Sequence, residues 1–155
     1  MKPRGSFLRD SHGAAAAEMA LVLPFLIVLM FGGLEAGHYF FREHQIVKAA
    51  REGARFAGRQ DMAAFDCATE TVDADTATLV EELIQDTVAG TPTVEVGVAP
   101  CIEDSATGLY TGIANGAPIA VVSVSMEYPS LFSNLGFGTT GLTLFARSQS
   151  AVMGL

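Results

Sequence analysis

The sequence predicts an α+β fold: a long N-terminal transmembrane helix, membrane-spanning in its first half, followed by a small domain with one short helix packed on a roughly three-stranded antiparallel sheet. Three observations lead to this prediction. A long apolar stretch lies near the N-terminus, an amphipathic helix and then alternating strands follow residue 60, and the charge divides into a basic front and an acidic back.

Composition sets the size and excludes several classes of protein. The chain has 155 residues, of which 50% are hydrophobic and 17% are charged, so it has room for one modest domain. Two cysteines are too few for a disulfide scaffold. The net charge of -8 argues against a nucleic-acid partner, because binding phosphates requires clustered Lys and Arg.

The net charge averages two different regions. Residues 1–60 carry eight basic and five acidic side chains, whereas residues 61–155 carry twelve acidic side chains and a single basic one, Arg147. The acidic balance therefore belongs to the C-terminal region, and the basic side chains flank the apolar stretch.

The apolar stretch runs from Ala14 to Phe41 and has no charged residue between Met19 and Leu34. A helix of that length reaches about 42 Å, more than the ~30 Å hydrocarbon core of a bilayer. The alternative is a buried core helix, but so small a domain has no core wide enough to cover a helix that is apolar all round. We predict a membrane span over about residues 19–41, with the lipid bilayer as a partner.

A cleaved secretory signal is a second alternative, because Lys2, Arg4 and Arg9 precede the apolar stretch. Such a signal needs small residues at both -1 and -3 after the stretch, and residues 31–37 offer no clean site. Small residues lie instead before the stretch, at 13–17, which favours processing upstream of a retained helix. The predicted division is a basic leader over 1–13, a long helix over 14–60 and an acidic domain over 61–155.

The orientation of the span follows from two opposing indications. Three basic residues precede the span and five follow it (Arg42, Lys48, Arg51, Arg55 and Arg59), and this count alone places the C-terminal part inside. Against it, long domains translocate largely regardless of charge, and the acidic domain carries two cysteines suited to an oxidising compartment. We predict a cytoplasmic N-terminus and an exported, periplasmic domain.

The helix is predicted to continue beyond the membrane to Gln60, because no proline interrupts residues 41–60. Basic side chains recur there at spacings of three and four, forming a stripe of Lys48, Arg51, Arg55 and Arg59. Three interpretations of the stripe stay open: a solvated face, a contact with the acidic domain and a contact with anionic headgroups. A second face carries the small residues Ala50, Gly53, Ala54 and Ala57, which allow another backbone to approach closely.

The acidic region shows one helix and three strands. Apolar residues recur on one face of Ala74–Val88, with Asp73 as a helix cap and with Gly90 and Pro92 ending the helix. Alternating or Val/Ile-rich segments then predict strands, separated by segments rich in Gly and Pro at 108–116 and 129–138. The predicted strands are Thr93–Ala99, Pro118–Tyr128 and Thr139–Ser150.

Two cysteines bracket the short helix and the first strand. Cys67 precedes the helix and Cys101 follows the strand, so a disulfide would close a loop of about 35 residues and destabilise the unfolded chain by nearly 4 kcal/mol. The alternative is two buried free thiols. In an oxidising compartment we predict the disulfide.

Catalytic and metal-binding constellations are not predicted. The three histidines, His12, His38 and His44, all lie in the leader or the long helix, so the acidic domain lacks the usual base or metal ligand. We therefore predict neither an enzyme, nor a metal site, nor a cofactor.

Several blocks of the sequence resemble the TadE-like pseudopilins (minor pilins) of the tight adherence (Flp/Tad) pilus system. The front blocks are GAAAAEM at 13–19, LVLPFL at 21–26 and FGGLEAG at 31–37. The segment AAREGARFA at 49–57 resembles the helix continuation of that family, and LTLFARSQSAVM at 142–153 resembles its closing strand.

The resemblance implies a pilin-like α+β domain after the long helix and a structural function in pilus assembly. A prepilin peptidase is expected to cut after Gly13, leaving Ala14 as the new N-terminus and Glu18 as its fifth residue. The implied partners are that peptidase, other pilins or pseudopilins and the inner-membrane assembly platform, and the implied location is the bacterial inner membrane or the pilus itself. The alternative is an uncleaved single-pass envelope protein whose periplasmic domain binds a partner.

Three polar side chains accompany the span. A carboxylate such as Glu18 is costly to insert into a membrane, so it needs a proton or a cation, and the freed amine of Ala14 on the same or a neighbouring chain fits that need. The alternative is that Glu18 lies at the interface, where the positive end of the helix dipole favours it. Glu35 and His38 lie about 25 Å or more further along. His38 and Arg42 lie on nearly the same helix face as Glu35 and are candidate partners for its carboxylate, but an interfacial anchor is the simpler interpretation.

Overall fold

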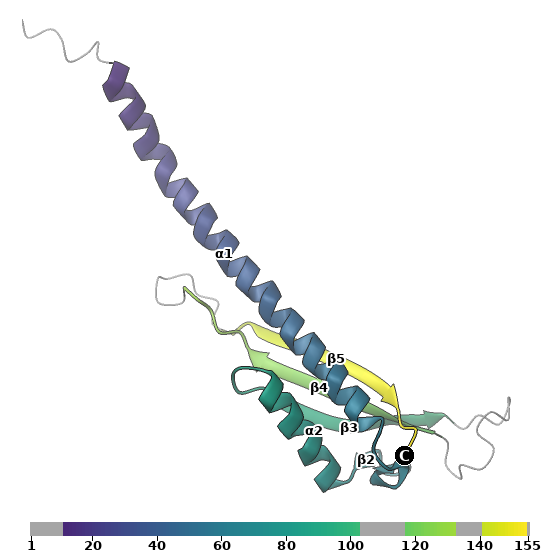
Figure 1. Cartoon of the computed structure of the whole chain (residues 1–155). Coiled ribbons are helices and arrows are strands. Elements are labelled where there is room, and N and C mark those ends of the chain that lie inside the picture. The colour runs from purple at the N-terminus through teal and green to yellow at the C-terminus, as the bar shows by residue number, and fades with distance from the viewer. Residues whose placement is uncertain (1–10, 103–116, 133–140, 155) are drawn as a thin grey trace, which may run out of the picture. The chain divides into compact units, whose positions relative to one another are not determined.

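The computed structural model describes residues 11–102, 117–132 and 141–154. The chain divides into two compact units, residues 1–38 and 39–155. The described part of the first unit is helical and belongs to α1 (Ser11–Ala57), which continues without interruption through Pro24 into the second unit. Figure 1 shows α1 as the purple-to-blue helix.

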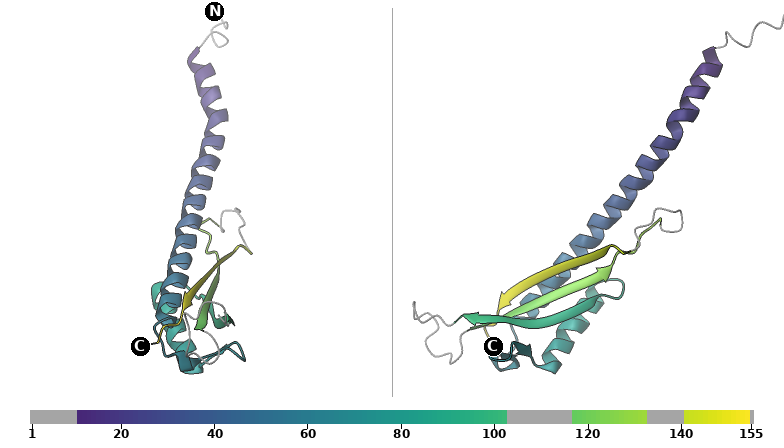
Figure 2. Two further views of the ribbon diagram at one scale, coloured as in Figure 1. Left: turned by 90° about the vertical axis from the view of Figure 1, so that its right-hand side faces the viewer. Right: turned by 180° about the vertical axis from the view of Figure 1, so that it is seen from behind.

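The second unit contains the end of α1, the short helix α2 (Ala74–Thr87) and a three-stranded sheet. The strands β3 (Thr93–Ile102), β4 (Ala117–Glu127) and β5 (Thr143–Ala151) pair antiparallel in the order β3-β4-β5. Both helices of this unit cover the same face of the sheet, as the front view and the view from behind agree (Figures 1 and 2). The predicted α+β class, the short helix and the three strands are confirmed.

The ends of the elements differ from the predictions by a few residues. The first helix ends at Ala57 rather than near Gln60, because Gly58 follows and the chain turns there. The first strand extends to Ile102, beyond the predicted Ala99, with a register shift after Ala99. Residues 139 and 140 of the predicted last strand lie outside the described residues.

The core of the second unit forms where the helices meet the sheet. Val122 and Val124, in the middle strand, are fully buried, and so are Val80 and Ile84 of α2. α1 contributes mainly small residues to this core. The buried α1 residues are Ile46, Ala49, Ala50, Gly53, Ala54 and Ala57.

Small residues bring α1 close to its neighbours. A Cβ on Gly53 would lie 2.7 Å from Ile84 Cδ1 and 3.4 Å from Val122 Cγ1, so α1 touches both α2 and β4 at this point. A Cβ on Gly58 would lie 2.7 Å from the carbonyl oxygen of Ala151 in β5, and the Gly58 carbonyl accepts a hydrogen bond from the Met153 N–H at 2.9 Å. The predicted close approach is therefore made within the chain, by its own sheet and second helix.

Two further contacts hold the helices in place. The Tyr39 and Tyr128 rings meet edge to face, with centroids 5.3 Å apart, at the point where β4 ends. The Arg42 guanidinium donates to the carbonyl oxygen of Ala89 at 3.2 Å, just beyond the end of α2. α2 has no basic residue in its last turn, so Arg42 supplies the cation that the negative end of the helix favours.

A small hairpin that the sequence analysis did not predict connects α1 to α2. It consists of a 3-10 turn (Met62–Ala64) and the two-residue strands β1 (Phe65–Asp66) and β2 (Thr71–Val72). The Asp66 carboxylate accepts hydrogen bonds from the N–H groups of Ala68 and Thr69, and these bonds, led by that of Ala68, hold the pKa of Asp66 below its usual range. The hairpin contacts β3 and β4.

We propose that this hairpin is tied to the sheet by the predicted disulfide. Cys67 lies in the turn of the hairpin and is half-buried, and the part of the chain that the structure describes contains no free cysteine thiol. Cys101 lies on β3, the strand that β2 contacts, but its side chain is outside the described residues. Contact between the hairpin and β3 supports the pairing.

Mass spectrometry of the unreduced protein tests this pairing. We expect both thiols to be blocked in protein from intact cells, and Cys67→Ser to lower the free energy of unfolding by about 2–4 kcal/mol. The double variant Cys67→Ser/Cys101→Ser should be no less stable than either single variant, because the same bond is lost. Two free thiols in the native protein would disprove the pairing.

Replacing Gly58 tests the contact between the end of α1 and β5. We expect Gly58→Ala to lower the free energy of unfolding by about 1–3 kcal/mol, because the new Cβ meets backbone that cannot move aside easily. Gly97→Ala is the control, since a Cβ on Gly97 meets nothing within 4 Å. Urea unfolding in detergent micelles, followed by near-ultraviolet circular dichroism of the tyrosines, measures the free energy of unfolding of both variants. Equal stability of the two variants would contradict a close contact between the end of α1 and β5.

Candidate functional site

The predicted processing segment lies in the first turns of α1. Gly13, Ala14 and Glu18 are all helical and exposed, and most of the predicted leader lies outside the described residues. Ala14 and Glu18 are four residues apart, so they lie on the same face of the helix within one turn of each other. The Gly13–Ala14 peptide bond is in the first turn, whose N–H groups have no acceptor within the helix, so this part unwinds at low cost.

Packing within the chain does not require glycine at position 13. A Cβ built on Gly13 meets no atom within 4 Å, so a larger side chain fits there without disturbing the described structure. Any requirement for glycine at this position therefore comes from another molecule. This makes Gly13 a clean position at which to test recognition by a peptidase.

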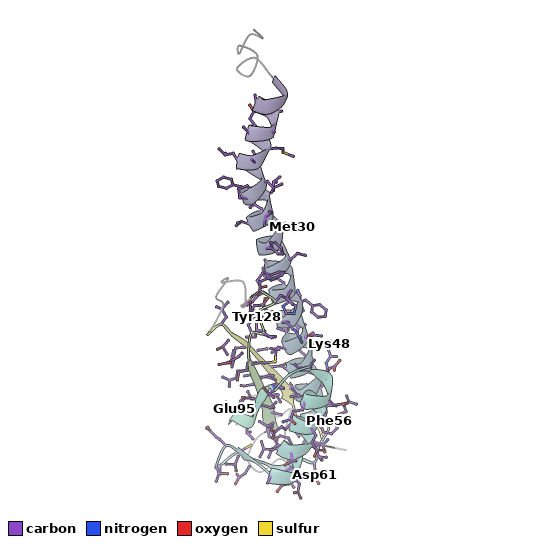
Figure 3. The ribbon with its side chains drawn as sticks, turned by 90° about the vertical axis from the view of Figure 1, so that its left-hand side faces the viewer. Met30, Lys48, Phe56, Asp61, Glu95 and Tyr128 are labelled. Carbon is purple, nitrogen blue, oxygen red and sulfur yellow. The ribbon has the colours of Figure 1, made fainter. Side chains whose placement is uncertain are left out.

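The apolar part of α1 exposes nearly all of its side chains. Leu29 is 71% exposed, and Met30, which is labelled in Figure 3, is 56% exposed. Most of the other large apolar residues from Met19 to Leu34 are exposed to a similar extent. Exposed apolar surface costs about 25 cal/mol per Å² in water, so a continuous sleeve of it requires an apolar surrounding. By its length and its apolar composition, the helix can cross a membrane.

These properties indicate a membrane-anchored protein with one N-terminal span. The predicted span over about 19–41 lies inside the candidate helix Gly13–Ala57. Three glycines in it, Gly32, Gly33 and Gly37, would meet no neighbour with an added Cβ, so the described chain leaves this face open.

The two polar residues predicted at the far end of the span are more enclosed than the apolar stretch. Glu35 and His38 are both half-buried and lie three residues apart, on the same face of α1. Their assignment as interfacial anchors stays a prediction.

A hollow of about 530 Å³ occurs on the second unit. It is lined by Arg42, by residues 89–91 and by strand residues that include Ser125, Glu127 and Thr143. No group of three or more His, Cys, Asp or Glu side chains suited to a metal ion occurs among the described residues. The side chains that line this hollow include no histidine or cysteine.

The position of Arg42 beside the end of α2 was not predicted from the sequence. In the sequence, Arg42 is one of the basic side chains that follow the span and lies on nearly the same helix face as Glu35. One signal for it is that the last turn of α2 has no basic residue. The cation that the negative end of this helix favours then has to come from another part of the chain.

Comparison with known proteins was informative for the N-terminal helix. Residues 13–55 match the profile of the family described as TadE-like protein, and no curated protein and no solved structure matches the chain significantly. The matched region begins at Gly13 and covers the apolar span together with most of the helix that packs on the sheet. The resemblance seen in the sequence is thereby confirmed over residues 13–55, where the chain is similar to TadE-like proteins.

Proposed function

We propose that the protein is a minor pilin or pseudopilin that serves as a structural component in assembly of a tight adherence pilus. The observation that carries the proposal is the family match over 13–55 on a helix that is apolar and exposed in its first half and packed on a small domain in its second. A TadE-like segment indicates a pilus-associated, structural protein rather than an enzyme.

The proposed maturation step is cleavage between Gly13 and Ala14 by a prepilin peptidase. Removal of the leader takes away three basic residues and one acidic residue, so the net charge changes from -8 to -10. It also creates a free amine on Ala14, one helical turn from the Glu18 carboxylate. The amine of the same or a neighbouring chain then compensates a carboxylate that is costly to leave alone in lipid.

The proposed location is the bacterial inner membrane, with the leader in the cytoplasm and residues 61–155 in the periplasm. The acidic domain and the disulfide proposed above support this orientation, although the basic residues after the span oppose it in the simple charge count. The other pilins and the assembly platform of the inner membrane are the proposed partners.

Cleavage is tested by co-expression with a prepilin peptidase and N-terminal sequencing. We expect a new start at Ala14, and no cleavage of Gly13→Leu, because a bulky side chain blocks the peptidase but not the fold. Gly32→Leu is the matched control, since position 32 is equally open. An intact Met1 in the wild-type chain would support instead an uncleaved single-pass envelope protein.

The role of Glu18 is tested by incorporation into complexes with other pilins. We expect Glu18→Ala to be exported but recovered about tenfold less in affinity-purified complexes, the equivalent of ~1.4 kcal/mol lost from one charge pair. Glu95→Ala, which removes an exposed carboxylate from the sheet, is the control and should behave as wild type. Recovery of Glu18→Ala at the wild-type level would assign the residue to the interface only.

A further inference from the structure

The basic stripe forms a ridge on the outer side of α1. All four members, Lys48, Arg51, Arg55 and Arg59, are exposed. At 100° per residue they point opposite to the buried face that packs on the sheet. Figure 3 shows Lys48 and Tyr128 on opposite sides of α1. We call this set the basic ridge.

The described chain neutralises little of the basic ridge. Lys48 Nζ lies 3.8 Å from Glu52 Oε1, an exposed pair with 73% and 44% of the two side chains accessible. Within residues 11–102, 117–132 and 141–154, the three arginines of the ridge form no ion pair. Arg59 Nε donates a hydrogen bond to the backbone carbonyl oxygen of Arg55. Three guanidinium groups are therefore available to carboxylates outside the chain.

The second helix carries a ridge of the opposite sign. Asp75, Glu82 and Asp86 are exposed on the side of α2 opposite to its buried Val80 and Ile84. Leu79 lies among them and is 49% exposed, and α2 contains no Lys or Arg. We call Asp75, Glu82 and Asp86 the acidic ridge.

The two ridges are complementary in charge and length. Each extends over twelve residues, or about 16 Å, and Arg59 lies in the turn just after α1. Both helices cover the same face of the sheet (Figure 1). The side chains of both ridges are exposed opposite to the buried faces of their helices, and no ion pair joins the two ridges within the described chain. Their natural partners are therefore ridges on another molecule.

We propose that the basic ridge of one copy of this chain docks on the acidic ridge of a second copy. Guanidinium–carboxylate pairs are short, often bidentate and directional, so three of them side by side define an orientation that a single exposed pair does not. Leu79 adds an apolar contact at the centre. Because the two surfaces differ, each pairing leaves one ridge of each sign free, and the contact can repeat along a row of copies.

This contact goes beyond the proposed function and does not require leader cleavage. It involves only residues from Lys48 onward, and it adds a contact between folded domains to any contact between membrane spans. A failed charge-reversal test would thus leave the cleavage result unaffected, and the reverse also holds.

The test uses the full-length chain in neutral detergent micelles and two charge-reversal variants. One variant, Arg51→Glu/Arg55→Glu/Arg59→Glu, makes the basic ridge acidic, and the other, Glu82→Lys/Asp86→Lys, makes the acidic ridge basic. Glu95→Lys/Glu127→Lys is the control, because both residues are exposed on strands outside the two ridges. Near-ultraviolet circular dichroism first checks that each variant is folded.

Sedimentation equilibrium then measures association. We expect the wild type and the control to associate, with an affinity that falls as salt rises from 50 to 500 mM, and each ridge variant to self-associate at least about tenfold more weakly. A mixture of the two ridge variants should associate again, because each then offers the sign that the other needs. This recovery distinguishes a specific contact from a damaged fold.

Three results would overturn the proposal. A wild-type chain that is monomeric, or that associates equally at all salt concentrations and in all variants, has no ridge contact. Two variants that lose association but do not recover it on mixing do not share one interface. A chain that stays monomeric but binds added phosphatidylglycerol through the basic ridge has a lipid headgroup as its occupant.

Discussion

The domain depends on how closely the second half of α1 approaches the sheet and α2. Ala50, Ala54 and Ala57 are fully buried, and Gly53 and Gly58 leave no room for a Cβ beside Ile84 and the backbone of β5. Larger residues on this face would push the helix outward and open voids that cost stability. The middle strand β4 is then covered by two helices at once, which explains why its valines are fully buried in so small a domain.

The two halves of one continuous helix are therefore suited to two different environments. Its first half buries no side chain in the described chain and presents large apolar residues, whereas its second half buries a small-residue face and exposes basic side chains on the opposite face. The change occurs near Tyr39, where the aromatic contact with Tyr128 begins the packed part. A continuous sleeve of large apolar side chains is more stable in lipid than in water. A face of small side chains packs without voids when its neighbours approach closely.

Much of the fold follows from local patterns. The amphipathic helix capped by Asp73 and the alternating strands were predictable because period and capping act over a few residues. The β1–β2 hairpin was not predictable, because two-residue strands carry no periodic signal and are held by the Asp66 carboxylate and by contacts with distant strands. The helix ended three residues early for a related reason, since Gly58 is required by β5, which lies almost ninety residues away in sequence.

The sequence by itself determined the apolar span, the division into basic and acidic regions and the family resemblance over 13–55, because these depend on composition and on spacing along one helix. The tertiary structure decided which faces are used. It assigned the small residues near Gly53 to contacts inside the chain, placed Arg42 at the end of α2, and left the basic and acidic ridges both exposed. The physical reason is that a helix presents several faces of similar character, and only the elements that pack against it determine which of them is buried.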